Sequence, residues 1–567
     1  MNLADREVIF VDCQTTGSSP TTGGLLELAF ARASARTELP EITYCIVKQP
    51  YNLIPDRITE LTGITVDDLD EAVSQRDVSR VLRQALIATP YSVIHYAKFE
   101  MPFLRSLMFD PLVNYRDNAP INFSVYCTHE IVRRIYPNFP ARGIRAIAGF
   151  FGKRLPPLKR ASSHVHATWI IWKYLVDVLA ENSITTDEDL VRFLTQPFKM
   201  KRGKYEYPIS RDKRLALPNK PGVYRMLDRH GDILYVGKAT SLKSRVNSYF
   251  RGQKKRDPEL LEMLTQVSDI DVTTCDTVIE AAVMESDLIK LHNPPYNAAL
   301  KETGRQIFFC SRDFGSKSER PDATHTLGPF TSAWSLDRLL RLCRCASTGD
   351  FDARIFMESL DPHLLEAGVD VFCRRWSVTR EQFADPRFTI AIGARLLRAS
   401  QRGQVQLETE QFIERSYGQL HIESLRTQTS VIIKPERVAI EKEVDAEEVS
   451  WKIARLLSRV AQNYLRSRRL TRLLNCLIYV QAEDGDKLIV VNDGMLAPKP
   501  ESLGRNDDSM EHETEGWMRQ AVWIGKTIAD YDRISVLFQE LQRVPHRVHV
   551  LRPAATDPLP VPAAVTD

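Results

Sequence analysis

The 567-residue sequence has no long apolar run and no CxxC pair of cysteines. No stretch approaches the ~18 apolar residues that a membrane span needs. The N-terminus also lacks the basic and apolar segments of a secretory signal. The nine cysteines are dispersed except for Cys343 and Cys345, and no CxxC pair occurs, which argues against a disulfide framework and a zinc ribbon. We therefore expect a cytoplasmic protein with no membrane association.

Net charge is also nearly absent, at +3, but the basic residues are unevenly placed. They gather in three stretches, namely Lys199, Lys201, Arg202, Lys204, Arg211, Lys213 and Arg214; Arg251, Lys254, Lys255 and Arg256; and Arg466, Arg468, Arg469 and Arg472. Solvated linker charge is the default interpretation of each cluster alone. Contact with nucleic-acid phosphates is the alternative that the clusters together favour.

Length and hydrophobic patterning predict an α/β multidomain chain. Apolar strands within 7–30 and at 92–95, followed by helical periodicity over 141–195, indicate a first α/β domain. The expected divisions are an α/β domain at 1–183, a basic linker at 184–215, a small α/β domain at 216–300, a strand-bearing extension at 301–349, a mainly helical region at 350–475 with a long helix at Ala446–Leu474, a C-terminal β-hairpin/α region at 476–552, and a disordered tail at 553–567.

Residues 216–300 bring together side chains that suit phosphodiester chemistry. A hairpin over Pro221–Gly237 would place Tyr224 and Tyr235 on one face. The segment Lys238–Phe250 has helical spacing, which would align Lys238, Arg245 and Tyr249. An amphipathic helix over Val278–Leu291 carries Glu285. Each residue alone is better explained as ordinary core or surface. Together they supply a carboxylate for a cation, a fixed positive charge and a tyrosine beside a lysine.

The same stretch closely resembles the GIY-YIG domain of the UvrC excinuclease and its shorter relative Cho. The matching segments are PGVY at 221–224, YVGKA at 235–239, LKSRVNSYF at 242–250, and IEAAVMESDLIK with PPYN within 279–297. The resemblance implies one Mg²⁺ or Mn²⁺ ion bound by Glu285, an Arg245 contact to the scissile phosphate, and water activation assisted by Tyr235. It implies that Lys238, Tyr224 and Tyr249 complete the site, and that Asn297 is the family's last structural polar position.

The resemblance extends weakly into Gly328–Ser332, similar to a segment that follows the UvrC nuclease domain, and then fades. We find no helix-hairpin-helix pattern, no carboxylates of a second UvrC nuclease, and no convincing UvrB-binding motif. Expected DNA contacts are Lys238, Arg245, Lys254, Lys255 and Arg256. Double-stranded, damaged DNA is the expected partner, with the UvrA/UvrB damage-recognition complex as the expected loader.

The first 180 residues resemble DnaQ-like proofreading exonucleases, which have an RNase H-like fold, but their metal-binding acids are reduced. Asp12 matches one acid of the first motif, while Gln14 replaces the second. Glu100 stands where Asp is usual, and Lys159 and His164 replace the His and Asp of the third motif. Two metal ions need several carboxylates, so we expect an inactive pocket. A single metal held by Asp12, Glu100 and His164 is the alternative.

These patterns leave several functions open. The leading hypothesis is a DNA-repair endonuclease that makes one incision, 3′ to a lesion, in nucleotide excision repair. A restriction or mobile-element nuclease would use the same fold. A DNA-binding scaffold, with or without a residual 3′–5′ exonuclease, is the hypothesis from another class. The intact set of tyrosines, Arg245 and Glu285 disfavours the scaffold.

Overall fold

The computed structural model describes residues 2–49, 54–108, 121–198, 204–251, 256–297, 306–331, 333–351, 355–356, 360–402, 445–481, 485–497, 523, 526–543 and 548–551. The expected DNA contacts Lys254 and Lys255, the basic residues Lys199, Lys201 and Arg202, and the tail at 553–567 lie outside these residues. The chain divides into two compact units, Met1–Thr274 with Pro294–Asn297, and Cys275–Asn293 with Ala298–Asp567. Within the described part, no helix is long and apolar enough to cross a membrane.

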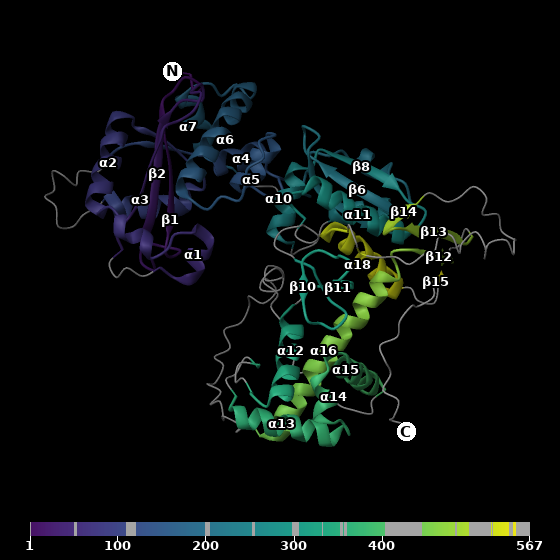
Figure 1. Cartoon of the computed structure of the whole chain (residues 1–567). Helices are drawn as coiled ribbons and strands as arrows, with labels where there is room; N and C mark the ends of the chain where they lie inside the picture. Colours follow the sequence, from purple (N-terminus) through teal and green to yellow (C-terminus); the bar gives the residue numbers. More distant parts are fainter. Residues whose placement is uncertain are drawn as a thin grey trace. The chain divides into compact units, whose positions relative to one another are not determined.

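The first unit begins with a five-stranded mixed sheet of order β3-β2-β1-β4-β5 (Figure 1). Strand β2 pairs antiparallel with β1, and β3 pairs antiparallel with β2. On the other side of β1, β4 pairs parallel with β1, and β5 pairs parallel with β4. The elements are β1 (Val8–Thr15), β2 (Leu25–Ala33), β3 (Ile42–Ile46), α1 (Asp56–Thr62), η1 (Asp67–Glu71), α2 (Gln75–Ala88), β4 (Tyr91–Ile94), α3 (Ala97–Met108), β5 (Ser124–Cys127), α4 (Thr128–Ile135), α5 (Ile144–Phe150), α6 (Ala161–Glu181) and α7 (Asp187–Thr195). The predicted strands and helices of an RNase H-like fold are confirmed.

Side chains alternate along β1 between two helical layers. Val8 and Phe10 pack with α4, α5 and α6, while Ile9 and Val11 pack with α2 and α3. This alternation also decides where the polar residues at the end of β1 point. Asp12 follows Phe10 toward α6, and Cys13 follows Val11 toward α3.

The stretch that we expected to be a basic linker, 184–215, contains two helices. Helix α7 packs against the first domain, because Leu190 is buried in its core and Tyr126 donates a 2.8 Å hydrogen bond to Asp187. The short helix α8 (Arg211–Leu215) instead packs beside α9 (Leu242–Tyr249), where Arg214 lies over the Phe250 ring. The linker is therefore folded at both ends.

A second sheet in this unit has the order β7-β6-β8, with all strands antiparallel. It consists of β6 (Gly222–Leu227), β7 (Ile233–Ala239) and β8 (Asp269–Thr274), and α10 (Pro258–Gln266) precedes β8. Its core joins Tyr224 and Met226 of the central strand to Leu242 and Val246 of α9 and Met263 of α10. The predicted hairpin is confirmed as β6 and β7.

The second unit has a helical part, built from α12 (Ala333–Thr348), α13 (Pro362–Arg375), α14 (Arg380–Ala384), α15 (Pro386–Gln401) and α16 (Ala446–Thr471). These helices share one apolar core in which Phe372 and Phe383 are fully buried. The strands β9 (Phe308–Cys310), β10 (Lys317–Ser318) and β11 (Leu327–Phe330) form a small sheet before it, of order β10-β9-β11. The predicted long helix is confirmed, ending three residues earlier than expected.

The rest of the second unit is a four-stranded antiparallel sheet of order β14-β13-β12-β15. Its strands are β12 (Cys476–Val480), β13 (Lys487–Asn492), β14 (Met495–Ala497) and β15 (Val548–Leu551). The predicted hairpin is β12 and β13. Helices α11 (Val278–His292) and α18 (Ile528–Arg543) pack together, and Ile279 and Val283 of α11 share a core with this sheet.

Candidate nuclease sites

Three tyrosines gather where β6, β7 and α9 meet. Tyr224 on β6 is fully buried, and its hydroxyl lies 2.8 Å from the hydroxyl of Tyr249 on α9. The ring centroids of Tyr224 and Tyr235 are 6.1 Å apart, and those of Tyr235 and Tyr249 are 6.4 Å apart. The sequence prediction that Tyr224 and Tyr235 share a face is confirmed.

Gly237 makes room for this cluster. It pairs with Tyr224 across the β6–β7 ladder. A Cβ added at Gly237 would lie 2.3 Å from the Tyr224 hydroxyl and 2.9 Å from the Tyr235 ring. Since no side chain fits at those distances, the glycine in the YVGK segment is required by the packing of two site tyrosines.

Helix α9 carries Arg245 and Tyr249 on one face. Ser241 caps its N-terminus by accepting a hydrogen bond from the Ser244 amide. Arg245 is exposed, and its guanidinium lies 5.0 Å from the centre of the Tyr249 ring. This cation–π contact holds a positive charge beside the tyrosine cluster.

The helical position predicted for Lys238 is wrong. Lys238 belongs to β7, where it pairs with Val223. The strand continues to Ala239 because its ladder with β6 outweighs the helical spacing of the segment, and the helix begins only after the Ser241 cap. Lys238 is half-buried.

Tyr224 is held in its protonated form. Burial raises the pKa of Tyr224 well above its ordinary value, and the neighbouring Tyr249 and Tyr235 raise it further. For Arg245, burial acts to lower the pKa, but Tyr224 and Tyr249 outweigh it, so the pKa of the guanidinium is raised. The cluster therefore presents a hydroxyl network beside a permanent cation.

The Asn297 side chain holds strand β7 through its backbone. Its side-chain oxygen accepts a 2.9 Å hydrogen bond from the Val236 amide, and its amide nitrogen donates a 2.9 Å bond to the Val236 carbonyl. The preceding Tyr296 donates its backbone N–H to the Leu234 carbonyl at 3.2 Å. Both contacts flank Tyr235, so the structural role expected for Asn297 is confirmed.

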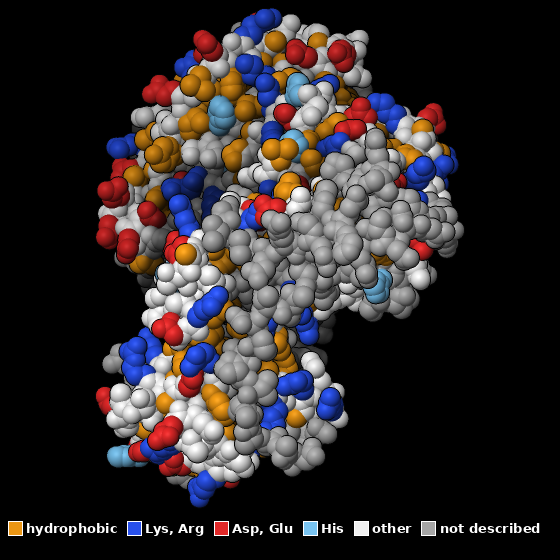
Figure 2. Space-filling view, turned by 45° about the vertical axis from the view of Figure 1, so that its right-hand side comes forward, with side chains coloured by type: hydrophobic (Ala, Val, Ile, Leu, Met, Phe, Trp, Pro, Cys, Tyr) orange, Lys and Arg blue, Asp and Glu red, His pale blue; other side chains and the backbone are white. Residues whose placement is uncertain are grey.

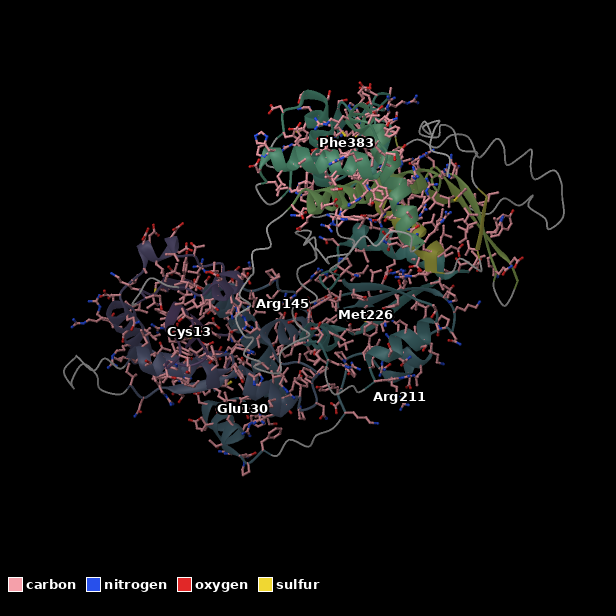
Figure 3. All side chains as sticks on the ribbon, turned by 90° about the horizontal axis from the view of Figure 1, so that it is seen from below. Cys13, Glu130, Arg145, Arg211, Met226 and Phe383 are labelled. Atoms are coloured by element: carbon pink, nitrogen blue, oxygen red, sulfur yellow. The ribbon has the colours of Figure 1, made fainter. Side chains whose placement is uncertain are left out.

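The first domain also contacts this sheet's supporting elements. Arg145 on α5 lies 3.1 Å from Glu262 on α10, and the Glu262 carboxylate accepts a 2.7 Å hydrogen bond from the Tyr296 hydroxyl. The Ala141 amide donates to Thr265 at 3.1 Å. In Figure 3, Arg145 lies between Cys13 of the first domain and Met226 of the sheet.

Glu285 lies on α11, in the second compact unit, and its side chain is half-buried. The helix begins with a capping box formed by Thr277 and Glu280. It is held to α18 by ion pairs from Asp287 to Arg533 at 3.0 Å and from Lys290 to Asp532 at 3.3 Å. The amphipathic helix predicted for this segment is confirmed.

Several of the clustered basic residues have structural partners. Lys213 pairs with Asp269 at 3.0 Å, and Arg256 donates hydrogen bonds to the backbone carbonyls of Tyr249 and Arg251. On the face seen in Figure 2, lysines and arginines are interspersed with acidic side chains. Arg256 thus has a structural role at the end of α9, which the sequence did not predict.

The exonuclease-like pocket brings together three of its five predicted residues. The His164 ring lies 3.3 Å from the Asp12 carboxylate. Gln14 donates a 3.4 Å hydrogen bond to the other Asp12 oxygen. Asp12 is 3% exposed, so a histidine and an amide enclose the one carboxylate that the first motif retains.

The other two residues do not join this contact. Glu100 accepts hydrogen bonds from the Cys13 amide at 3.0 Å and the Cys13 thiol at 2.6 Å, on the α3 side of the sheet. The Lys159 side chain is exposed. Burial, and then the charge of Asp12, raise the pKa of Glu100 well above its ordinary range, which favours a neutral carboxyl.

The pKa of His164 is raised beside Asp12. Burial works to lower its pKa, but the Asp12 hydrogen bond and charge outweigh burial and raise it. The contact with Asp12 thus favours the protonated form of the imidazole. Among the described residues, His, Cys, Asp and Glu form no group of three that could hold a metal ion. The alternative of one metal on Asp12, Glu100 and His164 stays a prediction, and it would require Glu100 to leave Cys13.

Sequence reasoning missed the partners of a further buried acid in this region. Glu27 on β2 is completely buried and pairs with Arg160 at 2.7 Å and with the Ala161 amide at 2.8 Å. These contacts fix the start of α6, three residues before His164. The signal was an acid in an otherwise apolar strand, LLELAF, which demands a cationic or N–H partner.

Comparisons with known proteins agree with this two-part organisation. Residues 220–298 match the UvrC-like GIY-YIG domain family, and residues 9–155 match the exonuclease family RNase_T. The chain is 28% identical over 405 residues to a Mycobacterium tuberculosis protein provisionally named a bifunctional exonuclease/endonuclease, covering 68% of this chain and 60% of that protein. It is 41% identical over 140 residues to UvrABC system protein C of Moorella thermoacetica, covering 24% of this chain and 22% of that protein.

Two solved structures are also similar. One is the GIY-YIG N-terminal endonuclease domain of UvrC from Thermotoga maritima, bound to magnesium, at 30% identity over 15% of this chain and 93% of that one, with a TM-score of 0.14. The other is E. coli exonuclease I with single-stranded DNA, in a zinc-bound form. It is 16% identical, covers 39% of this chain and 48% of that one, and has a TM-score of 0.28. The chain spans less than two thirds of the length of the two relatives named above. Residues 9–155 form an exonuclease-family domain, and residues 220–298 form a UvrC-like GIY-YIG domain.

Proposed function

We propose that the chain is a divalent-metal-dependent DNA endonuclease that cuts through its GIY-YIG domain. The observation that carries the proposal is the buried Tyr224, joined by hydroxyl contact to Tyr249, with the exposed Arg245 beside them. The UvrC-like family match includes all of these residues and Glu285. The space beside Gly237, which tyrosine rings fill, supports a site whose geometry is fixed before substrate binds.

Arg245 would contact the scissile phosphate, where its charge stabilises the extra negative charge of the transition state. Tyr224 stays protonated and so serves as a hydrogen-bond donor and not as a base. The half-buried Tyr235 would orient the attacking water and accept its proton. Lys238, on the same strand as Tyr235, would add a positive charge toward the DNA backbone.

Glu285 would hold a single Mg²⁺ or Mn²⁺ ion. The donor set fits such an ion, because Mg²⁺ keeps several of its waters and often takes only one or two protein carboxylates. When bound, the ion would polarise the phosphate and lower the pKa of a coordinated water.

We infer that the substrate is double-stranded, damaged DNA and that the incision is single and 3′ to the lesion, in nucleotide excision repair. The UvrC similarity supports this role, and the UvrA/UvrB damage-recognition complex would load the enzyme. The protein would then act in the cytoplasm, associated with the nucleoid. The exonuclease-like domain would bind DNA or a partner without cutting, since Asp12 is already paired with His164.

One experiment tests the proposal. The full chain is incubated with Mg²⁺ and a duplex carrying one bulky lesion, with and without UvrA and UvrB, and the products are mapped on both strands. We expect one nick, 3′ to the lesion and only on the damaged strand. Cutting of undamaged duplex at a fixed sequence would instead indicate a restriction or mobile-element nuclease. Binding without any cut would indicate a scaffold.

A further inference from the structure

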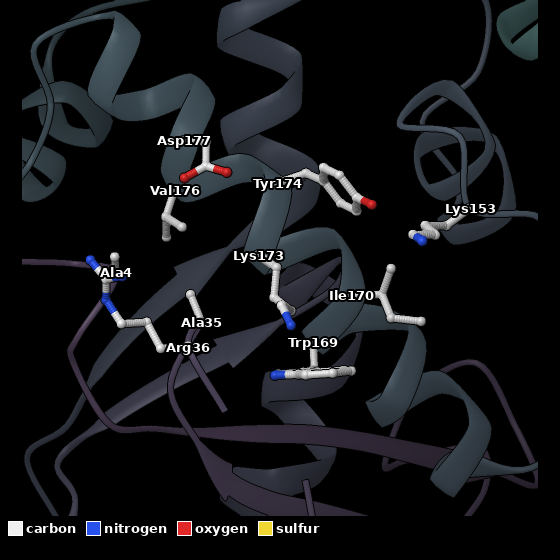
Figure 4. Close-up of a pocket in the computed structure, with 10 residues that line it drawn as sticks. All are labelled: Ala4, Ala35, Arg36, Lys153, Trp169, Ile170, Lys173, Tyr174, Val176 and Asp177. Carbon is white, nitrogen blue, oxygen red and sulfur yellow. The ribbon is translucent and has the colours of Figure 1, made fainter. Parts of the chain in front are cut away.

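A cavity of about 710 Å³ lies on the exonuclease-family domain, along the outer side of α6 (Figure 4). Its volume is within the roughly 300–1,000 Å³ of small-ligand sites. The residues that matter for its chemistry are Arg36, Lys153, Trp169, Lys173, Tyr174 and Asp177. Four of these come from α6, Arg36 follows β2, and Lys153 follows α5.

This cavity is distinct from the Asp12 pocket. Lys173 follows His164 by nine residues on α6. Nine residues correspond to about two and a half helical turns and roughly 13.5 Å along the axis. The two side chains therefore leave the helix on opposite faces, one toward Asp12 and the other toward the cavity.

The lining is predominantly cationic. Arg36, Lys153 and Lys173 line the cavity together with one carboxylate, Asp177, and Arg36 also forms an ion pair with Asp5 outside the lining. The Lys173 ammonium is held 4.6 Å from the centre of the Trp169 ring and 3.4 Å from the Thr37 carbonyl. Figure 4 shows Lys173 above Trp169, with Arg36 and Lys153 to either side. Positive charges arranged around a hollow favour a ligand with more than one negative charge.

The aromatic walls of the cavity are fixed in place. Trp169 donates its indole N–H to the Ser34 carbonyl at 3.2 Å. The Tyr174 ring stacks on Phe151, with centroids 5.3 Å apart and planes 7° apart. Rigid aromatic edges among cations are the combination that holds single-stranded nucleic acids, since rings contact bases or sugars while cations contact phosphates.

We propose that this cavity binds a segment of single-stranded DNA, with Lys153 and Lys173 on its phosphates and the half-buried Tyr174 ring against a sugar or base. The bases of an unpaired strand are free to contact the Tyr174 ring, whereas the bases of a duplex are stacked inside it. The inference rests on the proposed function for the identity of the polyanion. It assigns to the exonuclease-family domain the holding of an unpaired strand near the lesion.

The test measures how tightly the full chain carrying Glu285→Gln binds a labelled thymidine oligonucleotide in the absence of metal. Fluorescence anisotropy of the oligonucleotide reports the binding. We expect Lys153→Glu/Lys173→Glu to weaken binding by about tenfold or more, and to reduce the salt slope by about 0.7 for each phosphate that the cavity no longer neutralises. Lys153→Glu alone, which leaves the Lys173–Trp169 contact intact, should weaken binding less and in the same direction. The matched control is Arg76→Glu on α2, a charge reversal at an exposed position outside the cavity.

Equal effects of Arg76→Glu and the cavity variants would overturn the proposal, as would unchanged binding in the cavity variants. Equal binding of poly-glutamate would show that the cavity takes an acidic peptide instead. The proposed function has a separate readout, because the chain with Glu285 intact and both cavity lysines replaced should still nick a saturating duplex. If no version nicks, the proposed function fails while the binding result stands.

Discussion

The Arg145 guanidinium of the first domain lies 3.1 Å from the Glu262 carboxylate of α10. The same carboxylate oxygen accepts the Tyr296 hydroxyl at 2.7 Å, and Gln266 donates to that hydroxyl at 2.6 Å. Tyr296 in turn bonds to the β7 backbone directly before Tyr235. The exonuclease-family domain is thus connected through two side chains to the strand that carries a site tyrosine.

We predict that Arg145→Ala weakens this connection. The pair is mostly buried, with 25% and 20% of the two side chains exposed, so its removal should reduce the free energy of unfolding by about 1.5–3 kcal/mol. Turnover should fall more than DNA affinity, because β7 loses a support but no residue that binds DNA. Urea unfolding and single-turnover nicking measure these effects. Arg154→Ala, at an exposed position, is the control. Equal effects of the two variants would contradict a connection from Arg145 through Glu262 and Tyr296 to β7.

Glu285→Gln should abolish nicking while leaving the fold and DNA affinity nearly unchanged. The amide keeps the size of the side chain but is a poor ligand for a divalent cation. Cleavage is measured over a titration of Mn²⁺, which would reveal a weakened metal site as a rightward shift. Glu259→Gln, an exposed carboxylate on α10, should cut normally. Near wild-type cutting by Glu285→Gln would show that the metal is held elsewhere.

Arg245→Ala should lower kcat far more than it weakens DNA binding, since a phosphate contact that matters in the transition state contributes most there. The expected increase in activation free energy is about 2.7–4 kcal/mol, comparable to deleting one preorganised donor. Lys243→Ala removes another exposed cation of α9 and is the control. A defect confined to affinity would make Arg245 a docking residue only.

Much of the nuclease site could be predicted because its signals are local. The β6–β7 hairpin and the amphipathic α11 follow from short-range periodicity, and the tyrosine pair follows from the hairpin. Lys238 was misplaced because helical spacing cannot reveal a ladder with Val223, which is a pairing between strands. The role of Gly237 depends on the Tyr224 ring across that ladder, so no local pattern contains it.

In the exonuclease-like pocket, too, some contacts could be predicted from the sequence and others could not. That His164 stands beside Asp12 could be predicted from motif order, but the direction of Glu100 could not. Its partner Cys13 precedes it by 87 residues and faces α3 only because side chains alternate along β1. The Arg145–Glu262 pair joins residues 117 apart in the sequence, between elements whose contact no sequence pattern records.

The buried His95 predicts that the first domain loses stability in mild acid. Burial, and then the charges of His129 and His164, lower its pKa to about 3, while its ordinary value is 6.5. The unfolded chain therefore binds a proton that the folded chain does not, and stability should fall as pH decreases below about 6.5, by up to ~1.4 kcal/mol per pH unit. His95→Asn, which keeps an acceptor or donor for the Thr128 hydroxyl at 2.9 Å, should flatten this dependence between about pH 6.5 and 5. Urea unfolding at several pH values measures it, and the exposed His363→Gln should leave the slope unchanged.

The exonuclease-family domain is expected to lack 3′–5′ activity. Two metals about 4 Å apart need surrounding negative charge to offset their repulsion. Here Asp12 already faces His164 and Gln14, and the pKa of Glu100 is raised toward the neutral form. The full chain carrying Glu285→Gln should therefore leave a labelled 3′ end intact in Mg²⁺ or Mn²⁺.

The reverse change tests the same argument. Replacing His164 with Asp and Gln14 with Glu would remove the imidazole and add two carboxylates around Asp12. Calorimetric titration should then detect Mn²⁺ binding that is absent when Glu285→Gln alone is present, even if no exonuclease activity returns. Processive 3′–5′ digestion by the Glu285→Gln chain, abolished on adding Asp12→Ala, would instead show that one carboxylate and a histidine suffice. In that case the His164–Asp12 contact would have to open when a metal ion binds, because the His164 ring now lies 3.3 Å from an Asp12 oxygen that would coordinate the ion.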